Sequence, residues 1–217
     1  MTRGDSYAGY RSKLVEAVRA AGVRELAVLR AVGEVPRHLF VPPALQRQAY
    51  EDSSLPIGNG QTISQPSTHA RIIAALRLSG RERVLEVGTG SGYQTALLAL
   101  CVDQVFSVER VPALAERAKA ALREAGIANA SVMTGDGTLG WRAFAPFDAI
   151  VVAAASPEVP GPLLEQLAPG GRILLPLGPR DRQVITLVTL NPDGTLNQEP
   201  LTDARFVPLR GTHGFAE

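Results

Sequence analysis

One stretch decides the fold of this chain, Val84-Leu85-Glu86-Val87-Gly88-Thr89-Gly90-Ser91-Gly92-Tyr93. It begins as an apolar strand and passes through three glycines toward a helix, which lets the backbone approach a ligand at the carboxyl edge of a parallel sheet. The glycine spacing is G-x-G-x-G, whereas the dinucleotide fingerprint is G-x-G-x-x-G, so the loop disfavours NAD. Glu86 in the strand end would repel a pyrophosphate but suits the cationic amino group of S-adenosylmethionine.

Two further acidic residues follow the next predicted strands. Glu109 ends a strand 23 residues after Glu86, at the position from which a carboxylate can accept hydrogen bonds from ribose hydroxyls. Gly135-Asp136-Gly137 ends the following strand, where the Asp side chain can accept from an adenine amino group and a backbone N–H can meet a ring nitrogen. Together these elements predict an adenosyl pocket that also includes Gly88, Thr89, Gly90, Arg110 and Gly137.

Helical and strand patterns alternate after residue 67. Helices are expected at 68–78, 93–101, 113–125 and 161–168, and strands at 83–87, 104–109, 131–134, 147–153 and 172–177. This alternation predicts an α/β fold, a doubly wound and mostly parallel sheet covered by helices on both faces. Two β-rich runs, 183–190 and 204–209, flank the turn residues 191–194 and predict antiparallel strands at the end of the sheet.

The first 66 residues have a different character. They predict an amphipathic helix over 6–21 with Ser6 as its N-cap, and a second helix through Leu26, Leu29 and Val32 that ends before Pro36. A polar, non-periodic run over 50–66 is expected to be a functional loop. The chain is therefore divided into an N-terminal helical extension with an active-site loop, 1–66, and a Rossmann-like core, 67–217, within one compact domain.

Composition narrows the function classes. With 217 residues, 45% of them hydrophobic, and a net charge of +1, the chain is expected to be globular, without nucleic-acid or membrane partners. The single Cys101 and three scattered histidines lack metal-ligand spacing, so no metal is expected. The start of the sequence has no apolar run typical of a secretory signal, which predicts a cytoplasmic protein, and a monomer is expected.

A second motif narrows the assignment further. Gln61-Thr62-Ile63-Ser64-Gln65-Pro66, preceded by Asp52-Ser53-Ser54-Leu55-Pro56-Ile57-Gly58 and followed by the glycine loop, resembles the protein-L-isoaspartate (D-aspartate) O-methyltransferase family. The resemblance covers roughly residues 10 to 211, through Pro146-Phe147-Asp148, Gln166–Arg172 and Phe206–Leu209. The glycine motif is shared by many methyltransferases, whereas the Thr-Ile-Ser-Gln-Pro loop is distinctive of this family.

The resemblance implies methyl transfer from S-adenosylmethionine to the free α-carboxylate of L-isoaspartyl and D-aspartyl residues in age-damaged proteins and peptides. It implies that the product is S-adenosylhomocysteine and that the ester initiates repair through a succinimide. It places Ser64 at the active centre, and around the cofactor it places Gln61, Thr62, Ile63, Ser64 and His69 beside Gly88, Glu109, Asp136 and Gly137.

The chemistry agrees with these residues. A carboxylate with a reference pKa of about 3.9 is ionised at neutral pH, so its attack on a sulfonium methyl needs no general base. The protein must align the two groups and exclude water, and Leu55, Pro56, Ile57 and Ile63 are candidates for an apolar wall. Ser64 is then a hydrogen-bond donor to the carboxylate rather than a nucleophile.

From the residues alone, simpler interpretations stay open. Ser64 fits a loop serine that bonds its own backbone, and His69 fits a solvent-facing residue in the first turn of a helix. A small-molecule O-methyltransferase and a non-catalytic Rossmann-like binding protein are the alternative functions. A nucleic-acid amino-methyltransferase is disfavoured, because the segment after the fourth strand reads Ala154-Ala155-Ser156-Pro157 and no basic stripe is present.

Overall fold

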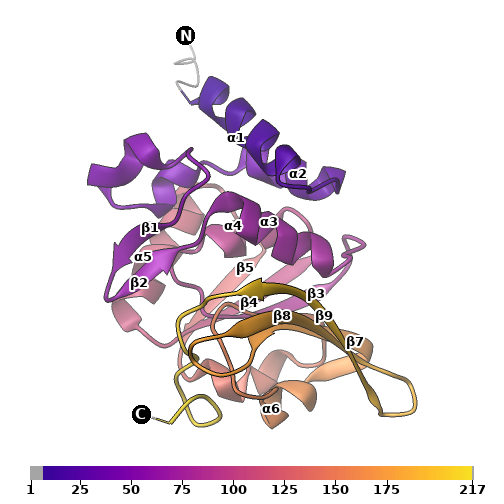
Figure 1. Ribbon diagram of the computed structural model, residues 1–217. Coiled ribbons are helices and arrows are strands. Elements are labelled where there is room, and N and C mark those ends of the chain that lie inside the picture. Colours follow the sequence, from indigo (N-terminus) through magenta and orange to yellow (C-terminus); the bar gives the residue numbers. More distant parts are fainter. Residues whose placement is uncertain (1–6, 217) are drawn as a thin grey trace.

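A seven-stranded sheet forms the centre of the molecule. The computed structural model describes residues 7–216 (Figure 1). Five strands run parallel to one another, namely β3 (Arg83–Val87), β4 (Gln104–Glu109), β5 (Ala130–Thr134), β6 (Phe147–Val152) and β7 (Leu167–Leu177). The antiparallel strands β8 (Gln183–Leu190) and β9 (Leu196–Ala204) complete the sheet in the order β5-β4-β3-β6-β7-β8-β9. The predicted doubly wound, mostly parallel fold is confirmed.

The strand order places the reversal point of the sheet at β3. The chain moves from β3 outward through β4 and β5, and then returns to the other side of β3 with β6. A crevice forms at such a reversal point, outside the carboxyl ends of the strands. The glycine loop that follows β3 therefore lies where open α/β sheets bind their ligands.

Each face of the sheet has its own hydrophobic core. On β3, Val84 joins a large cluster that includes Leu14, Tyr93 and Leu97, whereas Leu85 and Val87 join a second cluster with Phe147 and Leu163. This division follows from the alternation of side chains along a strand. Glu86 shares the face of Val84 and so lies beneath the first cluster's helices.

Helices cover both faces (Figure 1). The helices are α1 (Ala8–Ala20), α2 (Leu26–Glu34), α3 (Pro66–Ala75), α4 (Tyr93–Ala99), α5 (Pro112–Glu124) and α6 (Gly161–Leu164), with short 3-10 turns η1 (Arg37–Phe40), η2 (Pro43–Gln48), η3 (Gly137–Leu139) and η4 (Arg142–Phe144). The two N-terminal helices pack on α3 and α2 also contacts α4, so the N-terminal segment and the Rossmann-like core share one hydrophobic cluster. Ser6, the predicted N-cap, lies outside the described residues.

The segment 50–66, expected to be non-periodic, contains a hairpin. Strands β1 (Leu55–Gly58) and β2 (Gln61–Ile63) pair antiparallel. Their turn is made by Gly58, Asn59 and Gly60, all with positive φ, a conformation that Gly and Asn adopt most readily. The strands are too short to show a pattern in the sequence, which is why the expectation of an irregular loop was wrong in part.

Two expected boundaries near the C-terminus were also wrong. The helix expected over 161–168 ends at Leu164, and β7 already begins at Leu167, which pairs with Phe147 before the chain passes through Pro169-Gly170-Gly171. The last strand is 196–204 rather than 204–209. Strand β9 is an edge strand with largely exposed side chains, so it lacks the apolar alternation that reveals buried strands. Residues 206–209 instead run beside Ala155, to which Val207 and Leu209 are hydrogen-bonded.

Among residues 7–216, no helix combines the length and apolar character needed to cross a bilayer.

Candidate active site

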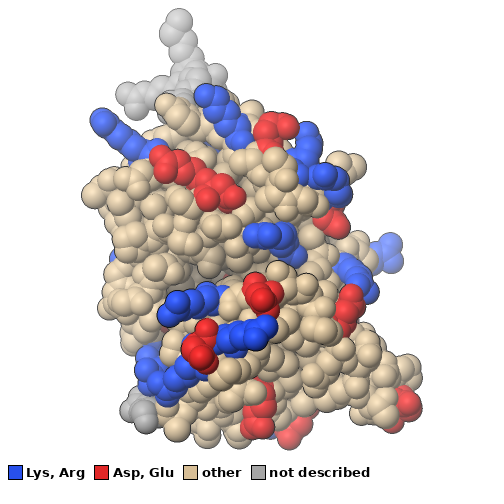
Figure 2. Space-filling view, in the orientation of Figure 1, with Lys and Arg blue, Asp and Glu red and all other residues tan. Residues whose placement is uncertain are grey.

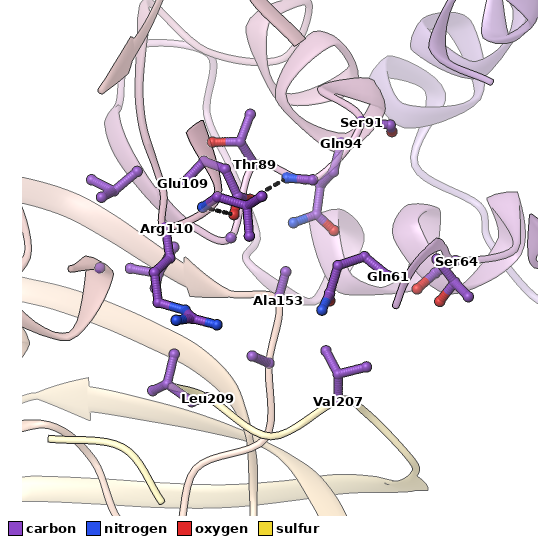
Figure 3. A pocket seen from close by; sticks show the side chains of 18 of the residues that line it. Gln61, Ser64, Thr89, Ser91, Gln94, Glu109, Arg110, Ala153, Val207 and Leu209 are labelled. Atoms are coloured by element: carbon purple, nitrogen blue, oxygen red, sulfur yellow. Dashed lines mark hydrogen bonds between the residues drawn. The ribbon is translucent and has the colours of Figure 1, made fainter. Parts of the chain in front are cut away.

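A pocket lies at the carboxyl ends of the central strands. It is lined by the ends of β3 and β4, by Gly137 after β5 and by Ala153 after β6. Two other segments complete the lining, namely 61–64, which consists of β2 and Ser64, and the C-terminal segment 207–210. Figure 3 shows Arg110 and Gln61 reaching into this space from opposite sides, with Leu209 and Val207 on the C-terminal segment beneath them. The fold therefore joins chain segments that are about 150 residues apart in one site.

The glycine loop wraps around a carboxylate. Glu109 at the end of β4 is 6% exposed, and its two oxygens accept hydrogen bonds from the backbone N–H groups of Gly90 and Val111, each at 2.8 Å. Gly88 has a φ of +95°, which L side chains rarely adopt. Glu109 thus faces the pocket from the position expected for a ribose-binding acid.

Glu86 lies below the loop rather than in the pocket lining. It is fully buried, and its carboxylate accepts hydrogen bonds from Gln94 Nε2 at 3.1 Å and from the hydroxyls of Thr95 and Ser107. Burial raises the pKa of Glu86 to about 7, although these three hydrogen bonds oppose the rise. Glu86 is connected to the pocket through two lining residues, Gln94 directly and Thr89 by way of the Ser107 hydroxyl.

Gln94 connects Glu86 to His69. Its amide oxygen lies 2.8 Å from His69 Nδ1. Because the amide NH₂ faces the carboxylate, the oxygen must face the histidine, and Nδ1 therefore donates the proton. Nε2 is then an unprotonated acceptor; it is buried and has no hydrogen-bond partner within residues 7–216. Burial lowers the pKa of His69 to about 4, so this tautomer is neutral at physiological pH.

Replacement of Glu86 by Gln should change how stability depends on pH. The carboxyl titrates near 4.5 when unfolded and near 7 in the native fold, so its protonated form stabilises the native state. That stability is complete below pH 4.5 and is lost as the pH rises to about 7. Relative to Glu86→Gln, the wild-type free energy of unfolding should therefore fall by about 3 kcal/mol over this range.

Urea unfolding at half-unit steps from pH 4.5 to 8 measures this difference. His69 titrates in the opposite sense, since its lowered pKa stabilises the native state above pH 6.5, but this contribution is present in both proteins. Glu124→Gln, at an exposed carboxyl on α5, serves as the control and should keep the wild-type pH profile. Parallel profiles for wild type and Glu86→Gln would contradict the raised pKa of Glu86.

Asp136 holds the C-terminal segment. One carboxylate oxygen accepts from the amide and hydroxyl of Thr138, and the other accepts from the amide and hydroxyl of Thr212. Burial alone would raise the pKa of Asp136, but these hydrogen bonds outweigh it and lower the pKa. The side chain, predicted to meet adenine, is thus turned toward residue 212, and the pocket is lined by the adjacent Gly137.

Ser64 lies at the junction of two cavities. It lines the pocket described above and also a neighbouring cavity formed by residues of α3, β8 and the segment 202–206. Its side chain is half-buried, and its hydroxyl makes no hydrogen bond within residues 7–216, which disfavours the interpretation as a loop-capping serine. Its carbonyl oxygen accepts a hydrogen bond from Arg37 at 3.1 Å.

The structure brings nearly all of the predicted site residues together. Apart from Glu86 and Asp136, they all line the pocket, namely Gln61, Thr62, Ile63, Ser64, His69, Gly88, Thr89, Gly90, Glu109, Arg110 and Gly137. Of the predicted apolar wall, only Ile63 lines this pocket; Leu55 and Ile57 are buried elsewhere and Pro56 is exposed. Two parts of the lining were not among the predicted site residues, Gln94 and the segment 207–210. Gln94 lies just beyond the glycine motif, and the stretch 206–209 was used for the family resemblance but was given no place in the site.

The donors and acceptors of the pocket fit S-adenosylmethionine. Glu109 is a carboxylate at the ribose position, and the unpartnered His69 Nε2 can accept from an ammonium group. Gly137 lines the pocket, and a Cβ there would lie 2.5 Å from Val87 Cγ1, so only glycine fits at this place in the lining. Among residues 7–216, no group of His, Cys, Asp and Glu side chains is arranged to hold a metal ion.

Comparisons with known proteins agree with the pocket. A family model described as protein-L-isoaspartate(D-aspartate) O-methyltransferase matches residues 9–214. The protein-L-isoaspartate O-methyltransferase 1 of Anaeromyxobacter sp. (strain Fw109-5) is 54% identical over 205 residues, which is 94% of this chain and 97% of that protein. The protein-L-isoaspartate O-methyltransferase of Syntrophus aciditrophicus is 50% identical over 98% of this chain and 99% of its own length.

Solved structures show the same similarity. A protein-L-isoaspartate O-methyltransferase superimposes with a TM-score of 0.85 at 32% identity, covering 94% of this chain and 67% of that one. A Plasmodium falciparum protein described as a protein-L-isoaspartate O-methyltransferase, in complex with S-adenosyl-L-homocysteine, gives a TM-score of 0.79 at 26% identity and covers 93% of this chain and 98% of its own.

Proposed function

The chain belongs to the protein-L-isoaspartate(D-aspartate) O-methyltransferase family, and from this premise we propose how its pocket performs the reaction. The activity is methylation of the free α-carboxylate of isoaspartyl residues in damaged proteins, with S-adenosylmethionine as the methyl donor. The methyl ester is a better electrophile than the carboxylate, so the neighbouring main-chain amide nitrogen attacks the ester carbonyl, methanol leaves and a succinimide closes. Hydrolysis of that ring returns part of the population to aspartate.

The observation that carries the proposed mechanism is the position of Ser64 between two cavities. The pocket with Glu109 and the glycine loop holds the donor, and the cavity beyond Ser64 receives the peptide. An acceptor carboxylate at Ser64 then reaches the donor pocket from the outside. This arrangement suits in-line transfer between two ligands that enter from different sides.

The chain's own groups do little chemistry in this reaction. S-adenosylmethionine supplies a methyl group on a sulfonium, and the acceptor is already an anion at neutral pH, so no general base is required. We assign to the Ser64 hydroxyl the role of donating a hydrogen bond to the acceptor carboxylate. We assign to Glu109 the binding of the ribose hydroxyls, and to His69 Nε2 the acceptance of a hydrogen bond from the ammonium group. Catalysis is then a matter of alignment and exclusion of water.

The experiment that tests the function is transfer of a labelled methyl group from S-adenosylmethionine to a synthetic isoaspartyl peptide. We expect the label in a base-labile ester, followed by a succinimide that forms without further enzyme. Label that appears in a base-stable product, or no label at all, would contradict a carboxyl methyltransferase.

Loss of the Glu109 carboxylate should weaken S-adenosylmethionine binding. Glu109→Ala removes the acceptors that buried ribose donors would use, at a cost of about 1–3 kcal/mol, measured by calorimetric titration.

Asp136→Ala should also weaken S-adenosylmethionine binding, and Thr212→Val distinguishes two reasons for the loss. If Asp136 acts by holding the segment 207–210, Thr212→Val should weaken binding too. If its carboxylate meets adenine directly, Thr212→Val should leave binding intact. Unchanged affinity in both Glu109→Ala and Asp136→Ala would place the cofactor elsewhere.

Four other expectations stay predictions. Figure 2 shows acidic and basic side chains interspersed over the face in view, which supports the expectation that nucleic acid is not a partner. A monomeric state, a cytoplasmic location and a division of the chain near residue 66 are expected from the sequence.

A further inference from the structure

Arg37 is a fully buried arginine that no part of the mechanism uses. Its side chain has 0% exposure, yet its guanidinium forms no ion pair with a carboxylate among residues 7–216. It donates instead to four backbone carbonyls, those of Ala49 (2.7 Å), Glu51 (3.3 Å), Ser53 (3.1 Å) and Ser64 (3.1 Å). One rigid, planar group therefore fixes four points of the backbone.

These four carbonyls lie at both ends of the β1–β2 hairpin. The residues 49–53 precede β1, and Ser64 follows β2 directly. Arg37 itself begins η1, in the N-terminal part of the chain. The guanidinium thus closes the base of the hairpin and fixes the backbone of Ser64 relative to the segment before it.

The same guanidinium also contacts the donor side of the site. Its Cζ lies 5.3 Å from the ring centroid of Tyr93, the first residue of α4 after the glycine loop. The Tyr93 ring is in turn 5.6 Å from the His69 ring, edge to face. Arg37 is therefore in contact both with the residue proposed to orient the acceptor and with the helix that begins at the donor loop.

Stability alone is a poor explanation for a cation at this position. Burial lowers the pKa of Arg37, which shows the cost of desolvating it, and an apolar side chain could fill the same space. What an apolar residue cannot do is hold four carbonyls at defined positions. Lys has the same charge, but its three N–H donors lie on one nitrogen. They cannot reach the four carbonyls that the two terminal nitrogens of the planar guanidinium contact.

We infer that Arg37 is a positioning residue for methyl transfer, which sets the place of Ser64 relative to the donor pocket. This inference rests on the proposed function, because it assigns Arg37 to the alignment of that reaction. The group does not touch either ligand. It acts through the Ser64 backbone, and a displacement of about 1 Å at a reacting centre can lower the rate about 100-fold.

The test uses Arg37→Lys and Arg37→Gln in single-turnover assays with an isoaspartyl peptide, with calorimetric titration of S-adenosylmethionine alongside. We expect the rate for bound substrate to fall roughly 10- to 100-fold in both variants, with a much smaller change in cofactor affinity. In a Ser64→Ala background the same Arg37 replacements should cost little, because the hydroxyl that Arg37 positions is absent. Such non-additivity is the signature of two residues that act together.

Arg83 provides the matched control. Its guanidinium also lies 5.3 Å from a ring centroid, that of Phe106, and donates to a carbonyl, that of Phe144. It does not line the pocket, so Arg83→Lys should change thermal stability but not the single-turnover rate.

Three results would overturn the inference. One is a wild-type single-turnover rate in folded Arg37→Lys. Another is a double variant of Arg37 and Ser64 whose rate falls by the product of the two single-variant factors. The third is failure of both Arg37 variants to fold, as judged by circular dichroism, since Arg37 would then act in folding. An inactive wild-type protein would instead contradict the proposed function itself, so the two failures are distinguishable.

Discussion

A peptide with one isoaspartyl residue should be methylated at least about 100-fold faster than the aspartyl peptide of the same sequence. The two peptides have the same composition and charge and differ only in the position of one methylene. In the isoaspartyl form, the free carboxylate is attached directly to Cα and the methylene lies in the main chain. In the aspartyl form, the methylene separates the carboxylate from the main chain.

The position of the methylene matters because the acceptor carboxylate must reach from the peptide cavity to the donor pocket while both ligands are held in place. In the proposed mechanism the peptide lies in the cavity outside Ser64, whereas the methyl group lies in the pocket inside it. A carboxylate on a different length of stem cannot place its oxygen in line with the methyl carbon while its main chain keeps the same contacts. Initial rates at low peptide concentration give the ratio of kcat/KM, the quantity that measures discrimination.

When the isoaspartyl and aspartyl peptides compete in one reaction, both are exposed to the same enzyme concentration. A third peptide, with a D-aspartyl residue, tests the second substrate class in the name of the family. Comparable rates for the isoaspartyl and aspartyl peptides would contradict a repair enzyme. They would leave the fold and the cofactor site intact, because neither depends on the acceptor.

Local motifs explain why much of the donor site could be predicted from the sequence. The glycine loop follows β3, Glu109 ends β4 and Gly137 follows β5, and the carboxyl ends of parallel strands meet at one edge of the sheet. The pattern of strands therefore determines which residues come together. The same logic placed Glu86 in the site, but alternation along β3 turns its side chain away from the pocket and under α4.

Contacts between distant segments explain what could not be predicted. The contact of Asp136 with adenine stays a prediction, but its hydrogen bonds to Thr212, 76 residues further along the chain, were not predicted. Residues 207–209 were expected to be part of a strand over 204–209, yet they lie outside the sheet strands and line the pocket. No periodicity in a sequence indicates such pairings.

Arg37 illustrates the same limit from the other end of the chain. In the sequence it stands in an irregular stretch between a helix and two prolines, where an arginine is expected to be solvated. Its guanidinium is buried among four carbonyls, from residues 49–53 and from Ser64, that only the tertiary structure brings together. Whether a cation is buried thus depends on the tertiary structure and cannot be predicted from the local sequence pattern.

Ser64→Ala should lower the single-turnover rate on an isoaspartyl peptide roughly 10- to 150-fold without abolishing it. A serine nucleophile would be indispensable, but here the acceptor is already an anion and no covalent enzyme intermediate is needed. The Ser64 hydroxyl has no hydrogen-bond partner within residues 7–216, so it is available to the substrate carboxylate. Loss of a hydrogen bond to a charged group costs about 1.5–3 kcal/mol, which gives the range stated.

Affinity for S-adenosylmethionine should change less than the rate, because the loop 61–64 keeps its backbone and Arg37 still holds the Ser64 carbonyl. Ser64→Thr retains a hydroxyl and should recover part of the rate, whereas Ser12→Ala on the exposed face of α1 should have no effect. A wild-type rate in Ser64→Ala would make Ser64 a structural loop residue. A methyl or acyl adduct trapped on Ser64 would overturn direct transfer, because in that case the serine would be a nucleophile and its loss would stop turnover.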